Sequence, residues 1–127
     1  MRLLFVCVEN SCRSQMAEAF ARLRGADAHS AGSRPSGEVN PRAIASMAEI
    51  GYDLAAHRST GLDDVISEES GRPFDAVVTM GCGDACPHVP ARARHDWAIP
   101  DPKAMEPEAF ARVRDMIRDH VDGLLQA

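Results

Sequence analysis

The sequence predicts an α/β domain in which four parallel strands form a sheet covered by helices on both faces. Short, nearly continuous apolar segments alternate along the chain with segments whose apolar residues recur at helical spacing, as they do in βα units. The chain has 127 residues, a length suited to one domain with a substantial hydrophobic core. We therefore expect residues 1–127 to form a single small three-layer α/β/α domain.

The first half of the chain predicts two βα units. Arg2–Val8 is an apolar run typical of a strand buried on both faces. Ser14–Arg24 carries apolar side chains at helical spacing, and a second short strand is expected at Ala28–Ala31. Asn40 then stands in an N-cap position before Pro41, a pair of residues that favours the start of another helix.

The second half predicts a short helix, two further strands and a long final helix. Residues 61–70 (GLDDVISEES) fit a short helix, and Phe74–Met80 is an apolar run typical of a buried strand. Asp96–Pro100 (DWAIP) is the candidate for the fourth strand. The last helix is expected over Glu106–Leu125, with an apolar stripe formed by Phe110, Val113, Ile117, Val121 and Leu124.

Composition and charge exclude several classes of function. The formal net charge is -5, and the sequence has no long block of like charges, so general affinity for nucleic acid or for an anionic membrane is not expected. No apolar run approaches the length of a membrane span, and Met1–Val8 lacks the features of a signal peptide. We expect a cytoplasmic protein, in which an anionic substrate would need a local site.

The chain has four cysteines, Cys7, Cys12, Cys82 and Cys86. In a reducing compartment they are not expected to form a static disulfide framework, which leaves redox chemistry or metal binding. Neither pair has the two-residue spacing of the usual zinc sites. We expect no metal site, with zinc held by the second pair and His88 as the alternative.

The loop after the first strand has the composition of an anion-binding nucleophilic site. Cys7 and Arg13 are separated by five residues, and Ser14 follows directly where a helix begins. Backbone N–H groups in such a loop point inward, the helix dipole adds positive potential, and an arginine can bind two oxygens of a tetrahedral anion. The same field favours the thiolate form of Cys7, to which Ser14 could donate a hydrogen bond. The anion would bind to Val8, Glu9, Asn10, Ser11, Cys12 and Arg13.

The alternative is that Cys7 is an unreactive core residue and Arg13 a solvated charge. The position of the loop, between a first strand and a first helix, favours the anion site. In open parallel sheets ligands bind outside the carboxyl ends of the strands. The segments that begin at Gly81 and Pro100 are expected at the same edge.

The second cysteine pair follows the third predicted strand. Cys82 and Cys86 lie four residues apart in the segment GCGDACP, whose glycines permit backbone movement. If the segment is helical or flexible, their Cα atoms can approach to about 6 Å, which suits a disulfide. Two inert buried cysteines at a strand end are the alternative.

In combination, these motifs resemble one family along nearly the whole chain. The segment CVENSCRSQMAEAF is similar to the signature of the low-molecular-weight phosphatase superfamily, and in particular of its thioredoxin-coupled arsenate reductases. Glu9 and Gln15 stand where phosphatases of this fold usually have Gly and Pro. The likeness continues through the segments HSAG, NPRAIASMAEIGYDL, VVTMGCGDACP, HDWAIPDP and FARVRDMI.

The resemblance implies an arsenate reductase with no cofactor. Cys7 would form a thiol-arsenate adduct, Cys82 would attack its sulfur, and Cys86 would take over the disulfide. Asp101, between two prolines, matches the general acid of the superfamily. The implied partners are arsenate, with phosphate as a competing anion, and either thioredoxin or a small thiol with a glutaredoxin-like protein. A cysteine at the position of Cys12 occurs in both branches, and we expect it to shape the loop.

Some reductases of this family hold a potassium ion through an Asn, a Glu, a Ser and an Asp. Asn10, Glu18 and Ser30 match the first three, but the fourth position falls near Thr60. A required potassium ion is therefore not expected. We assign no chemistry to His57, His88 and His95.

Two other functions stay open on the sequence. A tyrosine phosphatase would use Cys7, Arg13 and Asp101 but would have no use for the second cysteine pair. A redox or metalloid sensor would bind arsenite or zinc through its cysteines without turnover.

Overall fold

The strand after Met1 is the centre of the structure, and the rest of the chain is arranged around it. The computed structural model describes residues 1–69, 72–81 and 89–126. In chain order the elements are β1 (Arg2–Cys7), α1 (Arg13–Leu23), β2 (Asp27–Gly32), α2 (Pro41–Ala48), the 3-10 turn η1 (Leu54–Ala56), α3 (Leu62–Glu68), β3 (Phe74–Thr79), β4 (Ala91–Asp96) and α4 (Pro107–Gln126).

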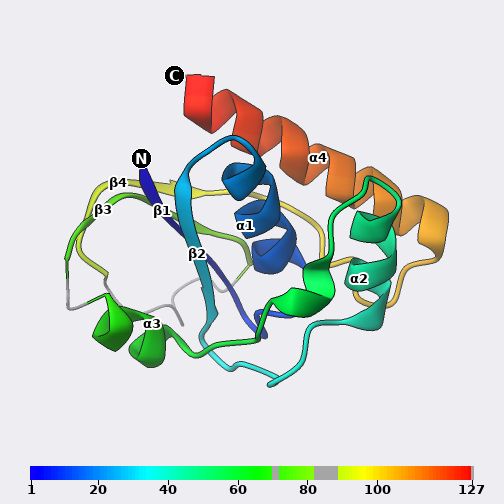
Figure 1. The fold of residues 1–127 in the computed structure, drawn as a ribbon, viewed down its shortest axis with the longest axis horizontal. Helices are drawn as coiled ribbons and strands as arrows, with labels where there is room; N and C mark the ends of the chain where they lie inside the picture. The colour runs from blue at the N-terminus through cyan, green and yellow to red at the C-terminus, as the bar shows by residue number, and fades with distance from the viewer. Residues whose placement is uncertain (70–71, 82–88, 127) are drawn as a thin grey trace.

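The four strands form one parallel sheet in the order β2-β1-β3-β4. β1 pairs with β2 on one side and with β3 on the other, so that Leu3 lies opposite both Ala28 and Ala76. This arrangement confirms the expected α/β fold with a four-stranded parallel sheet. Because all four strands run the same way, their carboxyl ends meet at one edge, as seen in Figure 1.

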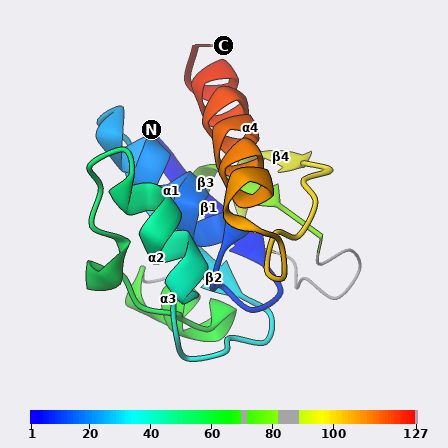
Figure 2. The same ribbon diagram turned by 90° about the vertical axis from the view of Figure 1, so that its right-hand side faces the viewer.

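Helices cover both faces of the sheet. On one face α1, α2 and α4 pack against the alternate residues Leu3, Phe5 and Cys7 of β1. On the other face α3 packs through Leu62 and Val65 against a second cluster that includes Leu4 and Val6. Figure 2 shows α4 extending alongside α1 and α2. The two inner strands, β1 and β3, are thus largely buried on both faces, which explains their nearly continuous apolar sequences.

Local sequence signals place the start of α2 and the buried face of α4. The Asn40 side chain accepts a hydrogen bond of 2.8 Å from the backbone N–H of Arg42, which confirms it as the N-cap of α2. The apolar stripe expected in the last helix is confirmed as well, because Phe110, Val113, Ile117 and Val121 are buried and Leu124 packs against the same core.

The fourth strand does not lie where the apolar pattern predicts it. β4 is Ala91–Asp96, and only its last residue belongs to the segment Asp96–Pro100 that we expected to be a strand. In the described part of the chain β4 pairs with β3 alone, and most of its side chains are exposed, Arg92 and His95 among them. An edge strand of this kind carries charged residues and lacks the apolar alternation of an internal strand. The turn η1 was also not predicted.

The packing of α4 makes a stability prediction. Phe110 is almost completely buried between α4 and the rest of the core, so Phe110→Ala should lower the free energy of unfolding by about 3–5 kcal/mol. Met116→Ala, on the exposed side of the same helix, is the matched control and should change it by less than about 1 kcal/mol. Urea denaturation followed by circular dichroism measures both, and equal losses would contradict this packing.

Candidate active site

A cavity of about 170 Å³ lies at the carboxyl edge of the sheet. The loop after β1 and the loop after β4 both contribute to it, together with the first residue of α1. The structure therefore brings together residues that the sequence places about ninety positions apart. The lining residues are Cys7, Val8, Glu9, Ser11, Cys12, Arg13, Asp101 and Lys103. Lys103 is the one member of this set that sequence reasoning missed, since nothing in its neighbourhood separates it from a solvated lysine.

Cys7 ends β1 with its sulfur next to a hydroxyl group. The distance from Cys7 Sγ to Ser14 Oγ is 2.8 Å, and both residues are buried. Ser14 Oγ accepts a hydrogen bond of 2.8 Å from Asn10 Nδ2. The hydroxyl proton of Ser14 is therefore free to be donated to the sulfur, as the sequence predicts. A thiolate at Cys7 would be stabilised by this hydrogen bond and by the positive end of α1.

Asn10 holds the loop in an unusual backbone conformation. Its φ is 53°, the left-handed region that asparagine tolerates better than most residues. The side chain is fully buried, and its oxygen accepts hydrogen bonds from Gln15 Nε2 at 2.9 Å and from the Thr60 N–H at 2.8 Å. Asn10 Nδ2 also donates to Ser30 Oγ at 3.0 Å. All the hydrogen-bonding capacity of this side chain is used to hold the loop in place.

Two glycines make room for the loop. A Cβ atom on Gly32, the last residue of β2, would lie 2.7 Å from the backbone oxygen of Val8. A Cβ atom on Gly81 would lie 2.5 Å from Arg13 Nη1, and Gly81 has a φ of +81°. Among the residues that the structure describes, the backbone N–H groups of Glu9, Ser11 and Cys12 have no hydrogen-bond acceptor. These N–H groups of the loop are thus available to an acceptor from outside the chain.

Arg13 is held against the loop that carries Asp101. Arg13 Nη1 donates a hydrogen bond of 3.0 Å to the carbonyl oxygen of Ile99, and Nη2 lies 3.9 Å from Asp101 Oδ2. The Arg13 side chain is nearly buried, whereas that of Asp101 is half exposed. A guanidinium group and a carboxyl group therefore face the same small cavity as the sulfur of Cys7. This set of groups can bind a tetrahedral oxyanion, attack it and protonate a leaving oxygen.

A further network of hydrogen bonds, through Gln15, His57 and Tyr52, supports the loop. Gln15 Oε1 is 2.9 Å from His57 Nδ1, and Tyr52 donates its hydroxyl proton to His57 Nε2 at 2.7 Å. Burial lowers the pKa of His57, although the Glu18 carboxylate, 3.2 Å from Nδ1, acts in the opposite direction. A neutral His57 that donates from Nδ1 fits both contacts. The sequence did not predict this role for His57, because its partners are distant in the chain.

Asn10, Glu18 and Ser30, which the sequence analysis compared with a potassium site, are already hydrogen-bonded to protein groups. Glu18 accepts a hydrogen bond of 2.7 Å from Ser30 Oγ and forms an ion pair of 3.1 Å with Arg22. Arg22 thus supplies the positive charge that faces this carboxylate. A separate group, Asp27, His29 and Glu69, brings its ligand atoms within 4.8 Å of one another at the opposite edge of the sheet. The Arg2 guanidinium already lies on both carboxylates of this group, 3.1 and 2.6 Å away, which opposes metal binding.

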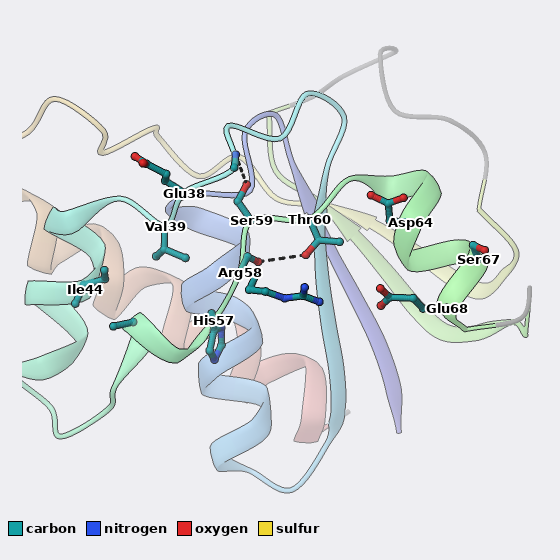
Figure 3. A pocket seen from close by; sticks show the side chains of 12 residues that line it. Glu38, Val39, Ile44, His57, Arg58, Ser59, Thr60, Asp64, Ser67 and Glu68 are labelled. Carbon is teal, nitrogen blue, oxygen red and sulfur yellow. Dashed lines mark hydrogen bonds between the residues drawn. The ribbon is translucent and has the colours of Figure 1, made fainter.

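A larger cavity, of about 640 Å³, lies elsewhere (Figure 3). Its wall carries Glu38, Asp64 and Glu68 together with Arg58 and His57. No cysteine is among the lining residues, and three carboxylates make it unsuited to an anion. The smaller cavity at Cys7 is therefore the candidate active site.

Three predicted residues cannot be placed. Cys82 and Cys86, together with the His88 of the zinc alternative, lie outside the described residues.

In the part of the chain that is described, no helix has the length and apolar character needed to cross a membrane.

The hydrogen bond from the Ser14 hydroxyl should affect how fast Cys7 reacts. Ser14→Ala removes the hydrogen bond to Cys7 Sγ and should slow alkylation of Cys7 by iodoacetamide at neutral pH about tenfold. Ser46→Ala, a buried serine of α2 that does not line the cavity, is the matched control and should leave the rate unchanged. Peptide mass spectrometry measures labelling at each cysteine. An unchanged rate in Ser14→Ala would show that the hydroxyl does not assist the sulfur.

Cys12 gives a second, pH-dependent prediction. Burial raises the pKa of the Cys12 thiol to about 11, and the weak hydrogen bond with Ser11 only partly opposes this shift. Because the thiolate is the reactive form, Cys12 of the folded protein should resist alkylation near pH 8 and become reactive only as the pH approaches 11. The same protein in concentrated urea should be labelled at Cys12 near pH 8. Equal labelling rates in the folded and unfolded protein at pH 8 would contradict this burial.

Comparison with known proteins agrees with the chemistry of this cavity. The profile of the low molecular weight phosphotyrosine protein phosphatase family matches residues 2–127. An arsenate reductase of Staphylococcus xylosus is 42% identical over 123 residues, which cover 91% of this chain and 89% of that protein. A glutaredoxin arsenate reductase of Synechocystis is 35% identical over 129 residues, which cover 98% and 95% of the two chains.

Solved structures of arsenate reductases also resemble this chain. An arsenate reductase in the phosphate binding state superposes with a TM-score of 0.83 at 33% identity, over 98% of this chain and 96% of that chain. A thioredoxin-dependent arsenate reductase of Corynebacterium glutamicum superposes with a TM-score of 0.77 at 30% identity, over 98% of this chain and 60% of that one. The chain therefore belongs to the low molecular weight phosphotyrosine protein phosphatase family, and its relatives include members named as arsenate reductases.

Proposed function

We propose that this protein is an arsenate reductase that uses Cys7 as its nucleophile. The observation that supports the proposal most directly is the sulfur of Cys7, 2.8 Å from Ser14 Oγ, in a cavity that Arg13 and Asp101 also line. The relatives named as arsenate reductases give independent support. We also propose the cytoplasm as its compartment, because thiols are kept reduced there.

Arsenate would bind with its oxygens on the loop N–H groups and on the Arg13 guanidinium. Arsenic would then lie next to the sulfur of Cys7, to which Ser14 can donate a hydrogen bond. A new sulfur–arsenic bond forms, and one arsenate oxygen leaves as hydroxide. Asp101 would donate the proton that converts this hydroxide to water.

The reduction step uses a second thiol. Cys82 as thiolate attacks the sulfur of Cys7, a disulfide forms between them, and the sulfur–arsenic bond breaks with both electrons going to arsenic. Arsenate is thereby reduced to arsenite, and two thiols are oxidised to one disulfide. Cys86 would then attack Cys82, releasing Cys7 as thiolate and leaving a Cys82–Cys86 disulfide for an external reductant.

The external reductant would be thioredoxin, or a small thiol with a glutaredoxin-like protein. The names of the relatives support the two protein reductants, since one is a glutaredoxin arsenate reductase and another is thioredoxin-dependent. The phosphate-bound state of one structural relative supports phosphate as a competing anion.

Phosphatase activity is the second candidate. The family profile supports it, and hydrolysis of a phosphate monoester needs only Cys7, Arg13 and Asp101. Such hydrolysis would give a thiol-phosphate intermediate that water resolves, with no part for Cys82 or Cys86.

The proposal predicts a change in mass without any added reductant. The fully reduced protein, freed of small thiols and mixed with arsenate, should lose two hydrogen atoms and release one arsenite. Peptide mapping should find Cys82 in a disulfide, with Cys7 or with Cys86. A protein that keeps all four free thiols and produces no arsenite would contradict the proposal.

Two variants separate the candidate activities. Cys7→Ser should abolish both arsenite formation and hydrolysis of an aryl phosphate. Cys82→Ser should abolish arsenite formation but leave any hydrolysis of an aryl phosphate intact, because hydrolysis does not use the second thiol. Arsenite formation by Cys82→Ser at the wild-type rate would exclude the proposed relay.

A further inference from the structure

The Cys7 cavity is lined by an ion pair that the chemistry above does not use, and both of its side chains are partly exposed to solvent. We call this solvent-exposed side of the cavity its mouth. Lys103 Nζ lies 2.5 and 3.0 Å from the two carboxylate oxygens of Glu9. Both residues line the cavity. Glu9 comes from the loop after β1 and Lys103 from the loop after β4, so the ion pair joins the two loops across the opening.

Each partner of the pair is held at its backbone. The carbonyl oxygen of Glu9 accepts hydrogen bonds from the Ser36 N–H at 3.0 Å and from Ser59 Oγ at 2.9 Å. The N–H of Lys103 donates to Asp101 Oδ1 at 3.1 Å. The backbone of each residue is therefore held by hydrogen bonds. The loop that carries Asp101 also carries Lys103.

The two charges at the mouth have opposite effects on an entering anion. Glu9 by itself would repel an arsenate or phosphate ion that enters the cavity. Lys103 neutralises this carboxylate, and its hydrogen bond with Glu9 raises the pKa of Lys103 and keeps the ammonium charged. A lysine ammonium has three donors, of which Glu9 occupies two, so one is left for an oxygen of the entering anion.

From this arrangement we infer that the Glu9–Lys103 pair determines the substrate class, admitting a free inorganic oxyanion and excluding monoesters. The inference rests on the proposed function, because it concerns which anion reaches Cys7. A free oxyanion with four small oxygens fits a cavity of about 170 Å³ and can meet the remaining donor of Lys103. The organic group of an aryl phosphate would project through the mouth, where it would have to displace the ion pair.

The first test changes the charge at the mouth and keeps its size. Glu9→Gln leaves Lys103 as an unpaired positive charge, and the Kd of inorganic phosphate should fall roughly fivefold to tenfold. Lys103→Met leaves Glu9 unpaired, and the Kd should rise by a similar factor. The two shifts should shrink at high salt because the mouth is partly exposed. Protection of Cys7 from iodoacetamide by phosphate measures Kd without requiring turnover.

The opposite changes in Kd expected for the two variants distinguish an electrostatic role of the ion pair from a merely structural one. If the ion pair only ties two loops together, both variants lose the tie and both should bind phosphate more weakly. That outcome would overturn the inference. Asp122→Asn and Arg24→Met make the same charge changes in an exposed ion pair at the other end of α1, and neither should shift the Kd.

The second test changes the size of the mouth. The double variant Glu9→Ala/Lys103→Ala removes both side chains and keeps the net charge, whereas Glu9→Gln/Lys103→Met keeps the bulk. The ratio of the Kd of phenyl phosphate to the Kd of phosphate should fall at least about fivefold in the first double variant relative to the second. An equal ratio in the two would overturn the inference. Both readouts use binding alone, so a wild-type protein that produces no arsenite would refute the proposed function without deciding this inference.

Discussion

The structure of the active loop depends on a directed chain of hydrogen bonds that ends at the sulfur of Cys7. Tyr52 donates to His57, His57 to Gln15, Gln15 to Asn10, Asn10 to Ser14, and Ser14 to Cys7. Each member accepts from the one behind it and donates to the one ahead, so every proton has a single consistent place. Buried chains of this kind strengthen each bond and leave few alternative arrangements. The left-handed backbone of Asn10 persists because this chain holds it.

Parallel topology supplies the other half of the site. β1 and β4 both end at the same edge of the sheet, which brings Cys7 and Asp101 to one cavity although they belong to opposite ends of the chain. Gly32 and Gly81 allow the neighbouring strand ends to approach the loop closely. The site is buried at the end of β1, around Cys7, and exposed where Asp101 and Lys103 face solvent. This division suits an enzyme that must hold a nucleophile still and admit a small anion.

Charge is balanced over short distances throughout this region. Arg13 faces Asp101, Arg22 faces Glu18, and Lys103 faces Glu9. The formal net charge of -5 does not oppose the proposed anion site, because the field at the loop comes from local donors and not from the overall charge. The exposed position of the Glu9–Lys103 pair makes it the part of this balance most open to change by an entering ligand.

The sequence by itself determined the local units: β1 followed by a loop and a helix, the cap of α2 at Asn40, and the apolar stripe of α4. Their signals lie in neighbouring residues, because strand and helix periodicity and capping are local properties. Only the tertiary structure decided the place of β4, the hydrogen-bond chain through His57, and the pairing of Glu9 with Lys103. β4 is an exposed edge strand without an apolar pattern, and Glu9 and Lys103 are 94 residues apart. Contacts of that kind arise from the way the sheet folds the chain back on itself, which no short stretch of sequence contains.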